Sequence, residues 1–504
     1  MKVTFDNNKF LFDGTADNFF TGNAYPVWFK IEENTEFKFI KNIVTGPRGV
    51  HIENRPGSTT DITVTWNTFT LDDDDGLVNK TTALQLVNTM PGKIVFTNNI
   101  VDAYMAICLF SGIEFTGTIE FADNTLSKGC KEFGSNEWGS NETTADNFAA
   151  SLLPARVGDV YYHSLSAAID AASGTDNAVV LVNDITVDTW DMIWNISGVT
   201  IDGQGHTIKV NGIKSGDNHD AIFHSAGGNT FRKLIIDMSE ITADSNIGGF
   251  RAISASAGDV IQNVTVIGNE HVEYGITVAG TGAEEESILV DGCVFRNCGY
   301  GVFSDYQTGL EKLTIEKCTF EGCEYATILY PEESEFIGNS VSGGKLNIMH
   351  PGQLITGNTF NDGSRIKFYD TPGEFSKNKV SEDSYLDSDD DVTGPVDVSE
   401  NYWGGGEPSD SQLGGASGIV SWTNYYLDEA MTQRSDDPEP EPEPGDDTPI
   451  IPPIDDDDDY IPIPPVVVDD SSSDDDTVKI VACAAAAVVA AIMAAFLILG
   501  HRRD

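Results

Sequence analysis

Four cysteines occupy equivalent positions in two similar segments of the sequence. The segments read DGCVFRNCGYGVF (291–303) and EKCTFEGCEYATI (316–328), so Cys293 matches Cys318 and Cys298 matches Cys323, both at 25 residues. If the segments form stacked strands, each pair is close enough for a disulfide or for simple packing in the interior. Four thiols also suit zinc, and the C-x4-C spacing does not exclude it. We expect packing, with the disulfide as the main alternative, and no metal or other cofactor.

Asparagines recur at similar intervals beyond the cysteines. The segments GNSV (338–341), GNTF (357–360), KNKV (377–380) and ENYW (400–403) space them by 19, 20 and 23 residues, at Asn339, Asn358, Asn378 and Asn401. Upstream, WNTF (66–69), TNNI (97–100) and DNTL (123–126) repeat the pattern at 31 and 26. Stacked amides can hydrogen-bond from turn to turn, and asparagine tolerates the left-handed conformation of turns. We therefore expect a structural ladder of asparagines rather than a ligand site.

Short strands must position these residues. Residues 1–434 contain brief β-branched or aromatic runs separated by Gly, Asn and Asp, and almost no helical periodicity. A repeat of 19–31 residues indicates a solenoid, and units without a repeated helix predict an all-β parallel β-helix in which each repeat is one turn. Leucine-rich repeats are the alternative, but here the apolar positions are mixed Val, Ile and Phe.

One helical segment divides the repeats into two coils. HSLSAAIDAAS (163–173) places four apolar residues at helical spacing: Leu165, Ala168, Ile169 and Ala172. A helix before the first strand of a coil would cover its apolar end. The sequence therefore predicts an N-terminal coil over 1–153 and a second coil, with its own capping helix, over 157–434.

The charge is divided between the coils and a linker. Of the net −51, residues 435–476 hold 17 acidic residues, no basic residue and 10 of the chain's 20 prolines, which predicts a disordered, extended stalk over 435–479. Residues 1–434 retain 62 acidic against 26 basic residues, a net −36. Such a surface argues against nucleic acid as a partner, because phosphate binding requires a basic surface.

A run of 21 uncharged residues, Ile480 to Gly500, has the length and composition of one transmembrane helix. Arg502 and Arg503 follow it, and the positive-inside rule then puts residues 501–504 in the cytoplasm and the coils outside the cell. The opening MKVTFDNNKFLFDG has no signal peptide, and strand-like runs begin at once. We therefore expect that the natural chain begins earlier, with further turns and a signal peptide, and unconventional export is the alternative.

These features together resemble a known class of surface protein. VGDVYYHSLSAAIDAASG, VLVNDITV and VTIDGQGHTI resemble the opening of prokaryotic, including archaeal, right-handed parallel β-helix proteins, and ENYWGGGEPSD with WTNYYLDEAM looks like their final turn. Adhesin-like members also carry acidic, proline-rich stalks and a C-terminal span. The resemblance implies a single-pass cell-membrane protein that acts in adhesion or surface display by binding an extracellular glycan or protein.

The same fold also hosts enzymes that cleave polysaccharides. GSRIKFYD contains Arg365-Ile366-Lys367, similar to the substrate-binding tripeptide of polygalacturonases, but the Asn-Thr-Asp, Asp-Asp and Gly-His-Gly elements of that family are absent in the required order. No carboxylate pair that could flank a glycosidic bond is identifiable from the sequence. We expect no catalytic residues and leave the ligand-binding residues open. A β-helix lyase or glycoside hydrolase is one alternative function, and a purely structural envelope component is another.

Overall fold

The structure is a computed structural model that describes most of the two predicted coils. The described residues are 1–12, 25–55, 58–72, 81–88, 92–110, 115–136, 143–144, 153–187, 193–210, 221–242, 250–283, 286–304, 306, 309–392 and 394–437. Apart from its first three residues, the predicted stalk (435–479) lies outside them, as do the predicted span (480–500) and tail (501–504). No helix within the described ranges is long and apolar enough to cross a membrane.

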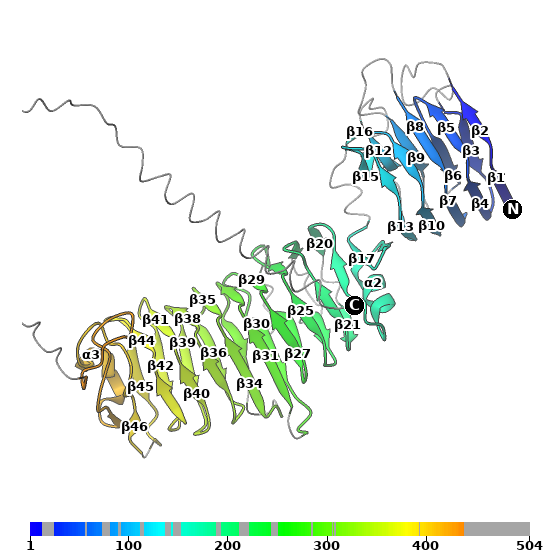
Figure 1. Cartoon of the computed structure of the whole chain (residues 1–504). Coiled ribbons are helices and arrows are strands. Elements are labelled where there is room, and N and C mark those ends of the chain that lie inside the picture. Colours follow the sequence, from blue (N-terminus) through cyan, green and yellow to red (C-terminus); the bar gives the residue numbers. More distant parts are fainter. Residues whose placement is uncertain are drawn as a thin grey trace, which may run out of the picture. The chain divides into compact units, whose positions relative to one another are not determined.

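The N-terminal coil has three strands in each turn, and every third strand belongs to the same sheet (Figure 1). Sheet A contains β1, β4, β7, β10 and β13, sheet B runs from β2 to β14, and sheet C runs from β3 to β15. Strands in successive turns pair in parallel, as β1 does with β4, β2 with β5 and β3 with β6, and the exception is β16, which pairs antiparallel with β15. The strands are β1 (Lys2–Asp6), β2 (Lys9–Leu11), β3 (Val27–Ile31), β4 (Thr35–Ile40), β5 (Ile43–Gly46), β6 (Val50–Asn54), β7 (Thr60–Thr65), β8 (Thr68–Leu71), β9 (Thr82–Val87), β10 (Lys93–Thr97), β11 (Ile100–Asp102), β12 (Met105–Phe110), β13 (Thr118–Ala122), β14 (Thr125–Leu126), β15 (Lys131–Asn136) and β16 (Thr143–Thr144).

The second coil repeats this plan: sheet A continues with every third strand from β19 to β43, sheet E contains every third strand from β20 to β44, and sheet F contains every third strand from β21 to β45. Its strands are β19 (Val179–Leu181), β20 (Ile185–Val187), β21 (Ile193–Ile196), β22 (Thr200–Asp202), β23 (Thr207–Val210), β24 (Ala221–Ser225), β25 (Thr230–Arg232), β26 (Ile235–Asp237), β27 (Arg251–Ser256), β28 (Val260–Gln262), β29 (Thr265–Ile267), β30 (Tyr274–Ala279), β31 (Ser287–Asp291), β32 (Val294–Arg296), β33 (Tyr300–Phe303), β34 (Lys312–Glu316), β35 (Thr319–Glu321), β36 (Tyr325–Leu329), β37 (Glu335–Ile337), β38 (Ser340–Ser342), β39 (Lys345–Ile348), β40 (Leu354–Thr356), β41 (Thr359–Asn361), β42 (Arg365–Phe368), β43 (Glu374–Ser376), β44 (Lys379–Val380) and β45 (Tyr385–Ser388). The expected all-β parallel solenoid is confirmed.

A hairpin and a helix join the two coils. Strands β17 (Ala155–Val157) and β18 (Val160–Tyr162) pair antiparallel, β18 with β13 and β17 with β19, so sheet A runs through both coils. Leu153 belongs to the apolar core of the N-terminal coil, whereas Ala155 belongs to the core of the second. Helix α2 (Leu165–Ala172) follows, and Ser164 caps it by accepting a hydrogen bond from Ala167 N. The helix buries the same four apolar residues that its sequence spacing singles out.

A small cluster closes the other end of the second coil. Helix α3 (Asp410–Leu413), the 3₁₀ turn η3 (Gly414–Ala416) and strands β46 (Val396–Asp397) and β47 (Val420–Ser421) follow β45. Gln412 Nε2 donates to Val380 O at 3.1 Å, and Leu413 and Trp403 are buried against the core. These contacts cover the apolar end that a stacked coil would otherwise expose.

Alternating burial explains why the short segments form strands. In β34, the residues Leu313 and Ile315 are buried while their neighbours stay in contact with water. Equivalent positions stack from turn to turn: the rings of Phe295 and Phe320 are 5.1 Å apart, and Val341 lies opposite Phe320 one turn later. Phe336 of β37 packs on Phe320 from sheet A at 5.9 Å. Each turn therefore buries its apolar face mainly against its two neighbours, as in other solenoids.

A short corner connects each strand of sheet A to the next strand, and buried asparagines from successive turns form a hydrogen-bonded ladder there. Asn358 Oδ1 accepts hydrogen bonds from Asn339 N at 2.8 Å and Asn339 Nδ2 at 3.1 Å, and Asn358 Nδ2 donates to Phe336 O at 2.8 Å. Asn378 and Asn401 continue the series in the same way, with bonds of 3.0 and 2.8 Å. The residue before each ladder position has a positive φ (Gly338, Gly357, Lys377 and Glu400). All four asparagines are buried.

The same corner holds cysteines one and two turns earlier. Cys318 N donates to Asn339 Oδ1 at 2.8 Å, and Cys293 N donates to Cys318 Sγ at 3.4 Å, so these two cysteines occupy ladder positions. The N-terminal coil has its own asparagine ladder through Asn8, Asn42, Asn67, Asn99 and Asn124. The sequence spacings of 31 and 26 residues predicted that Asn98 belongs to this ladder. The structure shifts the assignment by one residue, because Asn98 takes the positive-φ position instead.

Loss of one ladder amide should weaken the coil strongly. In Asn358→Ala, the Asn339 N–H and the Phe336 carbonyl lose their partners in the interior. We expect a loss of roughly 3 kcal/mol or more in the free energy of unfolding, measured by urea unfolding of the full chain. Asn361→Ala, on the outer side of the same turn, is the control and should change it by less than about 0.5 kcal/mol. Equal losses in the two variants would contradict the ladder's role.

A buried histidine makes the N-terminal coil sensitive to acid. His51 in β6 is 6% exposed, and its Nδ1 lies 3.3 Å from Gln85 Oε1. Burial, which disfavours the charged ring, lowers the pKa of His51 to about 4. Between that value and the ordinary 6.5, the unfolded chain binds a proton that the folded chain does not. The stability supplied by neutral His51 is therefore complete above pH 6.5 and is lost as the pH falls toward 4.

The acid sensitivity can be measured with one substitution. His51→Gln keeps a donor for Gln85 but cannot take up a proton. Between pH 7 and pH 4 we expect the wild-type chain to lose about 3 kcal/mol more unfolding free energy than His51→Gln, by urea unfolding at each pH. Parallel pH profiles for the two proteins would show that His51 is not responsible.

Candidate binding face

A column of tyrosines runs along the outer face of sheet F. The strand register places Tyr274 opposite Tyr300 and Tyr300 opposite Tyr325, at the start of strands β30, β33 and β36. The rings stack with centroids 5.4 Å apart at 28° for the first pair and 4.6 Å apart at 12° for the second. Burial raises the pKa of Tyr274 and of Tyr300 above the ordinary value, so both remain neutral.

Two further side chains widen this column into a surface. Phe303 packs on Tyr274 at 4.7 Å and meets Tyr300 edge to face at 5.0 Å. Ile328 lies opposite Phe303 in the neighbouring strand. All five residues are half-buried, with part of each side chain in contact with water. We call this set the aromatic platform: Tyr274, Phe303, Tyr300, Tyr325 and Ile328.

A cation lies at each end of the tyrosine column. The Arg251 guanidinium carbon is 5.6 Å from the centre of the Tyr274 ring, and Lys345 Nζ is 4.6 Å from that of Tyr325. Lys345 also pairs with Glu324 at 3.0 Å. The platform is therefore apolar in its middle and has a cationic side chain at each end, and the charge of Lys345 is balanced by Glu324.

The Arg-Ile-Lys tripeptide continues the same face in β42. Arg365 pairs with Asp387, and Lys367 Nζ lies 2.9 Å from Asp389 Oδ2 and 4.2 Å from the centre of the Tyr369 ring. Both cations are thus neutralised by acids of the next turn. Ile366 between them points into the core.

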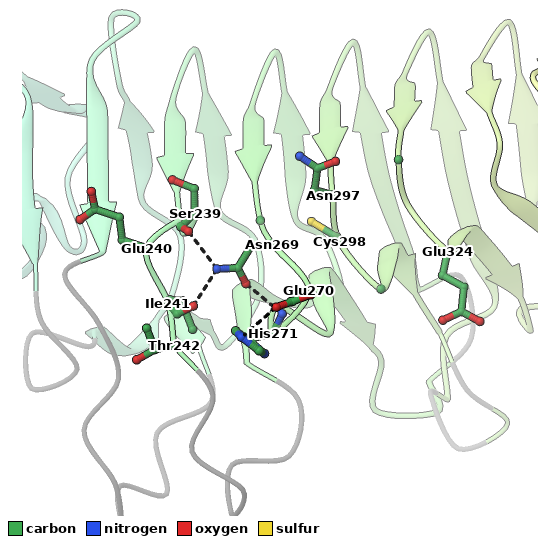
Figure 2. Close-up of a pocket in the computed structure, with 13 residues that line it drawn as sticks. Ser239, Glu240, Ile241, Thr242, Asn269, Glu270, His271, Asn297, Cys298 and Glu324 are labelled. Carbon is green, nitrogen blue, oxygen red and sulfur yellow. Dashed lines mark hydrogen bonds and ion pairs between the residues drawn. The ribbon is translucent and has the colours of Figure 1, made fainter.

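An open groove of about 900 Å³ borders the platform at the corner between sheets E and F. Figure 2 shows its lining from successive turns, including Asn269, which donates to Ser239 O at 2.9 Å and Ile241 O at 2.7 Å. Asn269 Oδ1 in turn accepts from His271 N at 2.9 Å. Gly299 also lines the groove and directly precedes Tyr300, so the groove and the platform are continuous.

The groove contains acids that the sequence analysis did not find. Glu240, Glu270 and Glu324 come from different turns and line it together with His271, whose Nε2 is 3.5 Å from Glu270 Oε1. A general acid requires a carboxyl whose surroundings favour its neutral form. The Glu270 side chain is 86% exposed and that of Glu324 is 65% exposed, so water screens both. Glu270 and Glu324 can accept hydrogen bonds from hydroxyl groups, and their exposure does not favour the neutral form that a general acid requires.

The four cysteines that the sequence repeat aligns lie at two corners of the second coil. Cys293 and Cys318 lie in the ladder, and Cys298 and Cys323 lie at the corner beside the groove, where Cys298 contributes to the lining. All four are buried free thiols. Within the described part of the chain, no group of three or more His, Cys, Asp or Glu side chains could hold a metal ion.

Comparison with known proteins identifies the fold of the second coil. The model of a right handed beta helix region matches residues 171–346, which include the groove and the aromatic platform. No curated protein and no solved structure matches the chain. The match and the parallel sheets agree on a right-handed β-helix, and the binding face must be interpreted from its own residues.

Proposed function

We propose that this right-handed β-helix protein is a cell-surface binding protein that holds a neutral glycan chain across the aromatic platform and the adjoining groove. The observation that carries the proposal is the stack of Tyr274, Tyr300 and Tyr325 beside a groove lined with hydrogen-bond acceptors. Tyrosine combines apolar area with a polar hydroxyl at low cost in conformational entropy, which suits it to recognition surfaces.

The charges of the face favour a neutral glycan over an acidic one. Lys209 and Lys345 balance Glu240 and Glu324, and the exposed Glu270 adds a negative charge, so these groups offer no net positive charge to a polyuronate. The carboxylate oxygens can accept hydrogen bonds from sugar hydroxyls. The edges of the tyrosine rings offer apolar contact for the C–H groups of the sugar. Successive turns present these groups about 4.8 Å apart, so an extended polymer can meet equivalent contacts along the coil.

The binding role can be tested with the full-length chain on a glycan array, followed by titration of the neutral oligosaccharides that bind. We expect Tyr325→Ala to weaken binding by about tenfold or more, as expected when a contact worth about 1.4 kcal/mol is lost. Tyr325→Phe keeps the stacked ring and should retain most of the affinity. Tyr385→Ala, an exposed tyrosine of the same sheet, is the matched control and should bind as wild type.

Other outcomes of this experiment separate the alternative functions. Preferential binding of polyuronates, or equal loss in Tyr325→Ala and Tyr385→Ala, would contradict the proposal. Release of shortened glycan would favour the lyase or hydrolase alternative, for which Glu240, Glu270 and His271 are the groups brought together in the groove. Neither binding nor cleavage of any glycan would favour a protein ligand or a structural role in the envelope.

The proposed location rests on the composition of the C-terminal part. A stalk with 17 acidic residues and 10 prolines, an uncharged stretch at 480–500 and two arginines after it are typical of a single-pass protein whose body lies outside the cell. Intact cells that express the natural gene product should therefore bind antibodies to the second coil. An epitope tag after Asp504 should become accessible only after permeabilisation, and a tag accessible on intact cells would refute this orientation.

A further inference from the structure

Two stacked cysteine pairs flank the neighbouring strands β32 and β35. The register pairs Arg296 with Glu321, so Cys298 and Cys323 stand at equivalent positions two residues beyond that pair. Neighbouring strands lie about 4.8 Å apart, which falls within the ~4.4–6.8 Å between Cα atoms that disulfides span. Spacing alone would thus allow a disulfide at either corner, and the surroundings must distinguish the two pairs.

Neither cysteine of the pair in the ladder lines the groove. Cys293 and Cys318 are 0% and 1% exposed, and the Cys318 sulfur accepts the Cys293 N–H where an amide oxygen serves in later turns. Cys293 Sγ also donates to Ile261 O at 3.4 Å. Burial and the neighbouring Cys293 raise the pKa of the Cys318 thiol, so the reactive thiolate is strongly disfavoured there.

The other pair lies beside the groove. Cys298 lines the groove, so an opening of this corner would expose both sulfurs to a small oxidant. The Cys298 sulfur donates to Arg296 O at 3.5 Å, and the Cys323 sulfur donates to Phe295 O at 3.6 Å. The neighbouring Cys323 and burial raise the pKa of the Cys298 thiol, whereas the neighbouring Cys298 lowers the pKa of Cys323, so the pair loses its first proton at Cys323. Cys298 and Cys323 are 2% and 3% exposed, and the position of Cys298 in the groove lining distinguishes this pair from the pair in the ladder.

We propose that Cys298 and Cys323 form a reversible disulfide between successive turns, whereas Cys293 and Cys318 remain reduced. With a small-molecule disulfide as oxidant, the Cys323 thiolate attacks one sulfur and releases one small thiolate. Cys298 then loses its proton, and its sulfur displaces the second small thiolate from Cys323. The two protein thiols are oxidised, and the small disulfide is reduced to two thiols.

The pairing can be mapped on the full-length chain after incubation with glutathione disulfide. Free thiols are alkylated under denaturing conditions, and the chain is cut with trypsin and a glutamate-specific protease. Cleavage after Arg296 separates Cys293 from Cys298, and cleavage after Glu321 separates Cys318 from Cys323. We expect one cross-linked peptide pair, joining Cys298 to Cys323, and alkylated Cys293 and Cys318. A Cys293–Cys318 link, links at both corners or no link would overturn the proposal.

Two serine variants provide a matched comparison. In Cys298→Ser the reaction should stop at a glutathione adduct on Cys323, whereas Cys293→Ser should still form the Cys298–Cys323 link. The wild-type Tm should rise by ~2 °C on oxidation, because the cross-link restricts the unfolded chain, and Cys298→Ser should show no such rise. The same rise in Cys298→Ser, or an adduct on Cys318 in place of Cys323, would contradict the assignment. These measurements need no glycan, so their outcome is independent of the proposed binding function.

Discussion

Hydrogen bonds from each turn to the next hold this coil together, and at the corner after sheet A they also set the phase of each turn. The buried amide of Asn358 bonds both the backbone and the side chain of Asn339, so neither turn can slide without breaking several bonds. Residues at equal distance beyond the corner therefore align on the outside. Tyr300 and Tyr325 each follow their ladder cysteine by seven residues and stack for that reason.

Much of the fold could be predicted because a residue type that recurs at similar intervals indicates the same structural position in successive turns. Asn339 and its equivalents recur wherever a left-handed residue precedes a buried amide, and the spacing of Leu165 and Ile169 indicates the helix that covers the second coil. The one-residue error at Asn98 arose where two asparagines are adjacent and both suit the corner. The hydrogen bond from Asn67 N to Asn99 Oδ1 and the positive φ of Asn98 distinguish them.

The binding face was harder to predict, although its signal was present. Tyr300 and Tyr325 occupy matching places in the two segments that the cysteines single out, yet a lone tyrosine in a strand is usually read as packing. The groove acids carry no sequence signal of this kind. One groove brings together Glu240, Glu270 and Glu324 because they lie in connections between sheets E and F in different turns. The lengths of those connections differ from turn to turn, so no constant sequence spacing indicates these residues.

The corner after sheet A has a constant length. From β25 onward, and throughout the N-terminal coil, two residues separate each strand of sheet A from the next strand, whereas the connections between sheets E and F range from two residues (β38 to β39) to 13 (β26 to β27). The connections between sheets E and F can therefore vary in length, while the two-residue corner after sheet A keeps these turns in register. In related chains, insertions and deletions should concentrate beside the groove, where they can change what the protein recognises without disturbing its core.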